Sequence, residues 1–478
     1  MRLGNHVAAA LAAFAVVAGC STIERAREAQ ESVAGLSLDD APSVVRANPA
    51  FGLMSLEELV GYAMTNRPSV ASAALAVDSA RLALREIDAD APLLGSKPWL
   101  SPHVSASGSY SEKTPAEHAK DFSFSTDRGS PSASLSISVL VYDFGRHRAR
   151  AHAQAHRILS AELDLAKTGY AVFGEVGAAY FSLLERRSLV EAELTNRVEC
   201  AEHLERARER LSSGEAKQLD VLRARLDLAK AEENLVAASN NLASARANFI
   251  KALGADAAGG SAGDLPSNVN PVASVRRGFA DTSFTFAEAY AFARTNAPAM
   301  RIARAKLRAA AADVDYTIAN LMPSVSATGS LSWVDPLWTW SWGASVVQSV
   351  FEGFRKTTAV DKAVLAMRQA AEDVAAAEQA LARNLEIAIA DRDNARESRR
   401  SARESFAAAR ENLALVRSQY DIGEASRVDF AEAVSDYVEA MVARISAFYA
   451  GQRAEAALFE LTGTYPSYDE KTLMEDEK

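Results

Sequence analysis

Two histidines have the spacing in this chain that best suits metal binding. His152 and His156 lie four positions apart, so on a helix both side chains would face the same way and could bind zinc. No acidic or cysteine ligand adjoins them, and Arg148, Arg150 and Arg157 crowd the same stretch with positive charge. The pattern therefore argues against a metal site, and we expect no cofactor.

Motifs of the common enzyme classes are absent from the sequence. It contains no phosphate-binding glycine loop, no Gly-x-Ser-x-Gly elbow and no cysteine–histidine pair in a catalytic context. The many carboxylates belong mostly to the polar faces of expected helices. The sequence therefore predicts a protein that is not an enzyme.

Cys20 closes a stretch that has the features of a secretory signal. The apolar run from Val7 to Val17 follows a positively charged start and is too short to span a membrane. The string Val-Ala-Gly-Cys that ends at Cys20 resembles a bacterial lipobox, whose cysteine becomes the lipidated first residue. We therefore predict a lipoprotein signal peptide over 1–19 and lipidation of Cys20, palmitate included. The alternative is an ordinary signal peptide. Residues 20–53 would form a lipidated, largely extended arm.

The composition is that of a large folded protein. The chain has 478 residues, of which 49% are hydrophobic and 24% are charged. Its formal net charge of −10 argues against nucleic acid as a partner. After the signal, no segment of the sequence reads as a membrane-spanning helix, so any crossing of a membrane would fall to strands.

Four stretches alternate small hydroxyl residues with mostly apolar residues. This period of two indicates strands with water on one face and an apolar medium on the other. The stretches form two hairpins, 101–142 and 322–350, and one hairpin end carries Trp333, Trp338, Trp340 and Trp342, as in an interfacial aromatic girdle. Four strands cannot close a barrel, so we expect the chain to combine its strands with those of identical copies. Strand counting alone allows two, three or four copies.

The second half of the chain repeats the order of the first. Pro102 to Ser109 matches Pro323 to Ser330, and Gly214-Glu-Ala matches Gly423-Glu-Ala. We therefore divide the chain after the arm into a first repeat at 54–254, an inter-repeat linker at 255–283, a second repeat at 284–463 and an acidic tail at 464–478.

Each repeat contains a long proline-free stretch, 145–211 or 354–420, that would form a helix of roughly 100 Å. A heptad seam from Val221 to Ala252 predicts a left-handed coiled coil, and the second copy interrupts this seam at Arg444 and Gly451. The expected fold is an α+β membrane protein. Each protomer would add four strands to a transmembrane β-barrel and helices to a long coiled-coil α-helical barrel.

The tips of the two long hairpins carry the most specific motifs. They are Leu211-Ser-Ser-Gly214 with Leu219-Asp-Val221, and Gln419-Tyr-Asp-Ile-Gly423 with Val428-Asp-Phe430. With the repeated order of elements, they resemble the outer-membrane efflux protein family, the TolC-like channels, and in particular its NodT-type lipoprotein branch. The resemblance implies a homotrimer in outer-membrane lipid that extends into the periplasm. It also implies docking onto a periplasmic adaptor (membrane fusion) protein and an inner-membrane transporter, with the tips at Gly214 and Gly423 meeting the adaptor.

The resemblance further implies a periplasmic gate. Asp429 and Glu432 match the acidic residues that form constriction rings in the family, and such rings would attract cations and repel anions. Asp220 and Tyr420 match members of the hydrogen-bond latch that holds neighbouring helix pairs closed. The family's latch arginine falls on Ala425, and the nearby Arg427 is not aligned with it.

The function implied is the outer-membrane channel of a tripartite efflux system, a passive export duct. Three alternatives remain: a duct for type I protein secretion, a non-conducting coiled-coil envelope tether or adhesin, and an envelope enzyme. Ion conductance in a bilayer would separate a duct from a tether, because a tether does not conduct.

Overall fold

The computed structural model describes residues 24–28, 30, 56–94, 102–111, 130–214, 217–254, 278–279, 285–334, 337–422, 424–463 and 468–469. The predicted signal peptide, Cys20 and Gly423 lie outside the described residues, as does most of the predicted arm, linker and tail.

The two halves of the chain form the same series of elements, so the internal repeat is confirmed. The first series is α2 (Leu56–Asn66), α3 (Pro68–Ala89), β1 (His103–Ser111), β2 (Ser130–Tyr142), α4 (Arg146–Ser212) and α5 (Gln218–Leu253). The second is α7 (Phe286–Asn296), α8 (Pro298–Ala319), β4 (Ser324–Val334), β5 (Leu337–Val347), α9 (Arg355–Asp421) and α10 (Arg427–Thr462). Corresponding helices have equal lengths of 11, 22, 67 and 36 residues.

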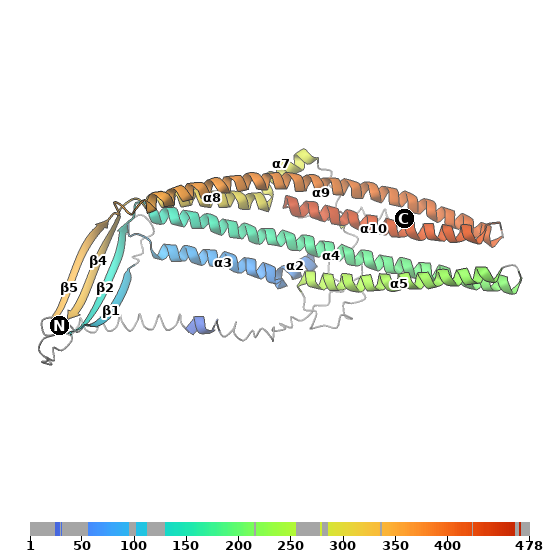
Figure 1. Cartoon of the computed structure of the whole chain (residues 1–478), viewed down its shortest axis with the longest axis horizontal. Helices are drawn as coiled ribbons and strands as arrows, with labels where there is room; N and C mark the ends of the chain where they lie inside the picture. Colours follow the sequence, from blue (N-terminus) through green and yellow to red (C-terminus); the bar gives the residue numbers. More distant parts are fainter. Residues whose placement is uncertain are drawn as a thin grey trace, which may run out of the picture.

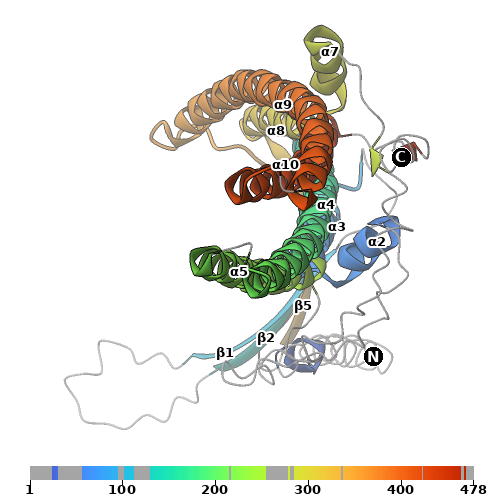
Figure 2. The ribbon, with the colours of Figure 1, turned by 90° about the vertical axis from the view of Figure 1, so that its right-hand side faces the viewer.

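The helices lie lengthwise beside one another, with the sheet at one end and the two helix–helix tips at the other (Figure 1). Seen down the long axis, they form an open arc rather than a closed bundle, and α2 and α7 lie outside it (Figure 2). At 1.5 Å per residue, α4 and α9 each extend about 100 Å. Among the described helices, none combines the length and the hydrophobicity needed to cross a membrane.

The shorter helices are arranged end to end. Pro68 and Pro298 occupy the first turns of α3 and α8, where their missing N–H groups cost no helical hydrogen bond. Gly254 and Gly463 end α5 and α10 with φ values of 70° each. A Cβ on Gly254 would lie 2.9 Å from Arg67 Cγ, and one on Gly463 would lie 2.9 Å from Pro298 Cδ. Each of these helices therefore ends against the start of the proline helix in its own repeat.

Each long helix follows a strand after a short connection, at a turn through left-handed backbone. In the first repeat, Phe144 and Gly145 have positive φ, and Asp143 accepts a 2.6 Å hydrogen bond from the His147 N–H. In the second, Glu352 accepts a 2.6 Å hydrogen bond from Arg355. Hydrogen bonds from Ser349 and Arg355 lower the pKa of Glu352 to about 2. An acidic side chain thus stabilises the first turn of both long helices.

The four predicted strands are confirmed as one antiparallel sheet of order β1-β2-β4-β5. The register places hydroxyl residues opposite one another, so a single row crosses all four strands: Ser107, Ser134, Ser332 and Thr339. β1 and β5 form the edges of this sheet. A second, two-stranded sheet pairs β3 (Gly278–Phe279) with β6 (Tyr468–Asp469), and so joins the predicted linker to the predicted tail.

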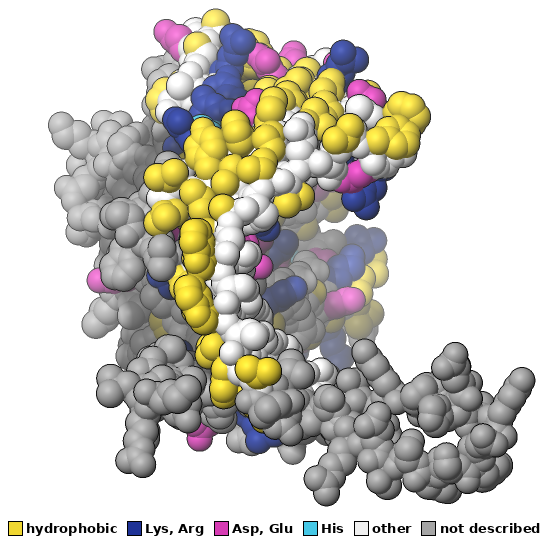
Figure 3. All heavy atoms as spheres, turned by 90° about the vertical axis from the view of Figure 1, so that its left-hand side faces the viewer, with side chains coloured by type: hydrophobic (Ala, Val, Ile, Leu, Met, Phe, Trp, Pro, Cys, Tyr) yellow, Lys and Arg dark blue, Asp and Glu magenta, His cyan; other side chains and the backbone are white. Residues whose placement is uncertain are grey.

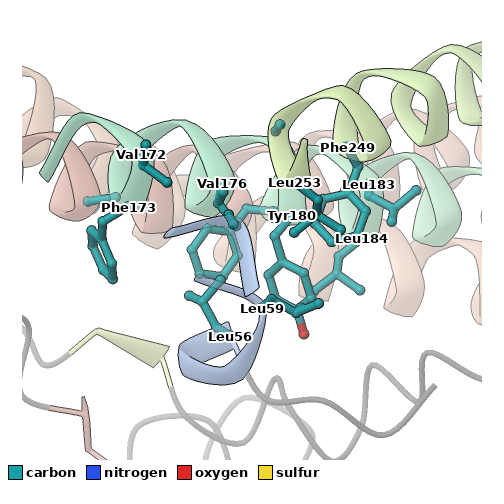
Figure 4. Close-up of a cluster of buried hydrophobic side chains, with 14 of the residues drawn as sticks. Leu56, Leu59, Val172, Phe173, Val176, Tyr180, Leu183, Leu184, Phe249 and Leu253 are labelled. Carbon is teal, nitrogen blue, oxygen red and sulfur yellow. The ribbon is translucent and has the colours of Figure 1, made fainter. Parts of the chain in front are cut away.

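The largest apolar cluster lies at mid-length and joins both repeats (Figure 4). It is formed by α2, α4, α5 and α10, and its buried members include Leu59, Tyr180, Phe249, Tyr449 and Phe459. The coiled-coil seam is also observed in α5, where Ala224, Ala231, Ala245, Phe249 and Ala252 are buried. At the predicted interruption in α10, Arg444 places its guanidinium carbon 4.7 Å from the centre of the Phe406 ring on α9.

Candidate gate and channel wall

Both helix–helix tips share one half of an N-terminal cap, an aspartate that accepts a hydrogen bond from the backbone N–H three residues before it. At the first tip, Gly214 is exposed with φ 80°, and the Asp220 carboxylate accepts a 3.1 Å hydrogen bond from the Lys217 N–H. At the second, the Asp429 carboxylate accepts a 3.0 Å hydrogen bond from the Ser426 N–H, and Ser426 Oγ accepts a 3.3 Å bond from the Asp429 N–H. Asp220 and Asp429 are therefore equivalent residues in the two repeats, and each stabilises the first turn of its helix.

Asp429 and Glu432 are exposed one turn apart on α10, near its N-terminus. The hydrogen bonds from Ser426 lower the pKa of Asp429 below its ordinary value. The position is negatively charged at neutral pH and open to solvent. The assignment of these two carboxylates to a gate formed with other copies stays a prediction.

Tyr420 lies in a compact cluster that we call the tip cluster, formed by His203, Arg210, Tyr420 and Phe430. Tyr420 is only 6% exposed, and its ring stacks on Phe430 at 5.0 Å between centroids. His203 of α4 stacks on Phe430 at 5.2 Å and lies 5.9 Å from the Tyr420 ring. The guanidinium carbon of Arg210, also on α4, lies 5.0 Å from the Tyr420 centroid. Three helices thus meet through rings and one cation.

Of the tip cluster, the sequence predicted a functional role only for Tyr420. Phe430 belongs to the heptad seam of α10, but His203 and Arg210 carry no local signal, because their partners lie more than two hundred residues away. The predicted latch between Asp220 and Tyr420 stays a prediction. Ala425 is half-buried, and the side chain of Arg427 lies outside what the structure describes.

One face of the four-stranded sheet is a grid of paired hydroxyl groups. Six cross-strand pairs have oxygen–oxygen distances of 2.7 to 2.9 Å: Ser105–Ser136, Ser107–Ser134, Ser109–Ser132, Ser326–Ser345, Ser330–Ser341 and Ser332–Thr339. The residues described in these four strands include no Asp, Glu, Lys or Arg. This face is therefore polar and carries almost no charge, with His103 as its one titratable side chain.

The opposite face is apolar and exposed. On β5, Trp340 is 75% exposed and Trp342 is 80% exposed. From the sheet end of the molecule, hydrophobic side chains follow one side of the sheet and uncharged polar ones the other (Figure 3). An exposed apolar surface of this kind marks contact with a membrane or another protein.

The two histidines lie together on α4 but are not part of a larger ligand set. The His152 and His156 rings are 5.2 Å apart, edge to face. Burial, with the positive charges of His152 and Arg308, lowers the pKa of His156. Among the described residues, no group of three or more histidine, cysteine or acidic side chains gathers as a metal site would require.

A family comparison decides what this architecture is. The model of the outer membrane efflux protein family matches residues 59–255 and 289–464, which is well over half of the chain. The chain belongs to the outer membrane efflux protein family. The predicted resemblance is thereby confirmed at the level of the family, whereas the NodT-type lipoprotein branch stays a prediction. No curated protein matches this outer membrane efflux protein.

Solved structures of bacterial membrane proteins share its fold. A membrane protein from Pseudomonas aeruginosa is 21% identical with a TM-score of 0.71, over 85% of this chain and 93% of that one. The outer membrane protein VceC of Vibrio cholerae is 15% identical with a TM-score of 0.70, over 86% and 96%. The CmeC outer membrane channel of Campylobacter jejuni is 17% identical with a TM-score of 0.70, over 89% and 90%.

Membership in the family gives the two faces of the sheet a consistent interpretation. A member of this family lies in the outer membrane, where apolar side chains are stable against lipid and hydroxyl groups are not. The tryptophan-bearing face is therefore the one suited to lipid, and the hydroxyl face is the one suited to water.

Proposed function

We propose that this outer membrane efflux protein is the passive outer-membrane duct of a tripartite efflux system. Three copies would combine their four-stranded sheets into one transmembrane barrel and their helical arcs into one tunnel through the periplasm. The observation that carries this proposal is the isolated sheet itself: it has a hydroxyl face, an apolar face and two edge strands, β1 and β5. Sheet edges in lipid leave backbone groups without hydrogen bonds, so pairing β5 with β1 of another copy would remove that cost.

The test is the oligomeric state and conductance of the purified protein. In detergent we expect a trimer, and in planar lipid bilayers we expect discrete ion-conducting channels. A sample that stays monomeric, or a trimer that inserts without conducting, would contradict the duct and favour the envelope tether.

The lipid anchor is part of the proposal. Cys20 would be acylated at the mature N-terminus and hold residues 20–53 near the membrane. Cells fed radiolabelled palmitate should label the wild-type protein, and Cys20→Ser should abolish the label. Cys200 is a matched control, since it is half-buried on α4 and its thiol has a pKa raised by burial to about 11, so Cys200→Ser should leave the label unchanged.

The adaptor would contact the two tips. The described end of α4 supports this proposal, because Ser212, Ser213 and Gly214 are all exposed at the end farthest from the sheet (Figure 1). A photo-crosslinking residue in place of Ser213 should capture the adaptor in cells. The same residue in place of Ala237, exposed midway along α5, should not.

A further inference from the structure

The two long hairpins of the protomer contact each other differently along their length. At mid-length, Tyr449, Ala456 and Phe459 of α10 are buried in the same apolar cluster as α4 residues. Nearer the tips, the apolar cluster of Leu204, Ala207 and Ala224 contains residues of α4 and α5 among those the structure describes. There, α9 and α10 meet α4 through the tip cluster and through ion pairs of Arg417.

The ion pairs are the weaker part of this contact. Arg417 lies 3.5 Å from both Glu199 and Glu202, and the Arg417 side chain is 39% exposed. Long, solvent-accessible ion pairs contribute little and are screened by salt. The tip cluster is different, because His203, Tyr420 and Phe430 are all at most 6% exposed. Arg210 itself is half-buried, so its guanidinium over the Tyr420 ring is partly shielded from water, and a partly shielded cation is attracted to a ring more strongly than one at an open surface.

The tip cluster is directly connected to the proposed gate. Phe430 follows Asp429 in α10, and Tyr420 lies on the last turn of α9. Any movement of Phe430 away from His203 must carry Asp429 with it, since both belong to the same rigid helical turn.

We propose that Arg210 and His203 are positioning residues that hold the α9–α10 hairpin against α4, and so set the ratio of open to closed states of the gate. The inference rests on the proposed duct and on the gate at Asp429 and Glu432. It assigns the holding contact to stacking and cation–π attraction within one protomer, and it gives α4 a part in gating.

The test compares two arginine–aromatic contacts of similar geometry. Arg210→Ala removes the cation over Tyr420 and should raise the ratio of open to closed dwell times in planar bilayers roughly tenfold, equivalent to about 1.4 kcal/mol. Arg210→Lys keeps a cation and should restore most of the closed state. His203→Ala should act in the same direction as Arg210→Ala. Arg444→Ala, which removes the contact with Phe406 inside the α9–α10 hairpin, should leave the ratio unchanged.

A crosslink separates holding from a general loss of stability. In a Cys200→Ser background, Glu202→Cys and Arg417→Cys can be joined by a short bifunctional reagent, since these side chains meet across α4 and α9. Adding this link to Arg210→Ala should return the dwell ratio to that of the wild type. If the wild type conducts and Arg210→Ala has the same ratio of open to closed dwell times, the inference is overturned. It is also overturned if Arg444→Ala changes this ratio as much as Arg210→Ala does. A wild type that does not conduct would contradict the duct itself.

Discussion

At the residue scale, Asp429 combines a local role with a proposed one at the pore. Its cap is local, because Ser426 and Asp429 lie three positions apart and meet as soon as the helix begins. The cap at Thr285 and Glu288 has the same three-residue spacing. The surroundings of Tyr420 were not predictable in this way, because His203 and Arg210 approach it only once two distant hairpins have packed.

The two roles of Asp429 can be separated by removing charge without removing the cap. Asp429→Asn keeps an oxygen that can accept from Ser426, and Glu432→Gln is its partner substitution. We expect this double variant to lose cation preference in planar bilayers, measured as the reversal potential under a salt gradient. The exposed Glu411→Gln on α9 is the control. An unchanged reversal potential in the double variant would reject the gate assignment.

The pH dependence of this selectivity follows from the same hydrogen bonds. They lower the pKa of Asp429 below 3.8, so the carboxylate stays charged at about pH 5 and cation preference should persist there. The Asp429 carboxylate stabilises the first turn of α10 fully at pH values above its pKa in the unfolded chain. That stabilisation is lost as the pH falls through its lower pKa in the folded protein.

At the element scale, helix lengths were predictable because proline and glycine mark the ends and the long stretches between them contain no proline. The exception in the seam also has a physical reason. Arg444 interrupts the apolar heptad of α10, but it lies against Phe406 on α9 and so keeps the two helices in contact. Periodicity alone could not identify a ring on the facing helix as the partner of that charge.

The end-to-end arrangement of α10 and α8 depends on Gly463. Gly463→Ala would place a Cβ 2.9 Å from Pro298 Cδ and 3.3 Å from Asn296 O, at a φ of 70°. The left-handed backbone alone costs an alanine about 1 to 2 kcal/mol, and the clash with Pro298 adds to this. We expect a lower midpoint of thermal unfolding for the purified protein.

Gly451 supplies the control for this prediction on the same helix. It lies inside α10, and a Cβ there would meet nothing within 4 Å. Gly451→Ala should therefore stabilise the helix by about 0.5 to 1 kcal/mol. Equal destabilisation by both substitutions would show that Gly463 has no special role as a helix end.

At the scale of the whole molecule, the sequence predicted a sheet that cannot be complete in one copy. Alternation of hydroxyl and apolar residues was sufficient for this, since a period of two sets the two faces before any tertiary contact forms. The number of copies was not determined by alternation. That number depends on the strand tilt at which the barrel closes and on the curvature of the helical arc. The spacing of residues in the sequence determines neither quantity.

Adjacent residues on β2 test which face meets lipid. Ile137 belongs to the apolar face and Ser136 to the hydroxyl face, where it pairs with Ser105 at 2.7 Å, and both lie near the middle of the strand. A lysine facing lipid near the bilayer centre costs about 2 to 4 kcal/mol per copy, whereas one facing a water-filled lumen remains hydrated. Ile137→Lys should therefore reduce the amount of trimer recovered from outer membranes. Ser136→Lys should still assemble and should shift ion preference toward anions. Normal assembly of Ile137→Lys together with failure of Ser136→Lys would reverse the faces and place the serine grid against lipid.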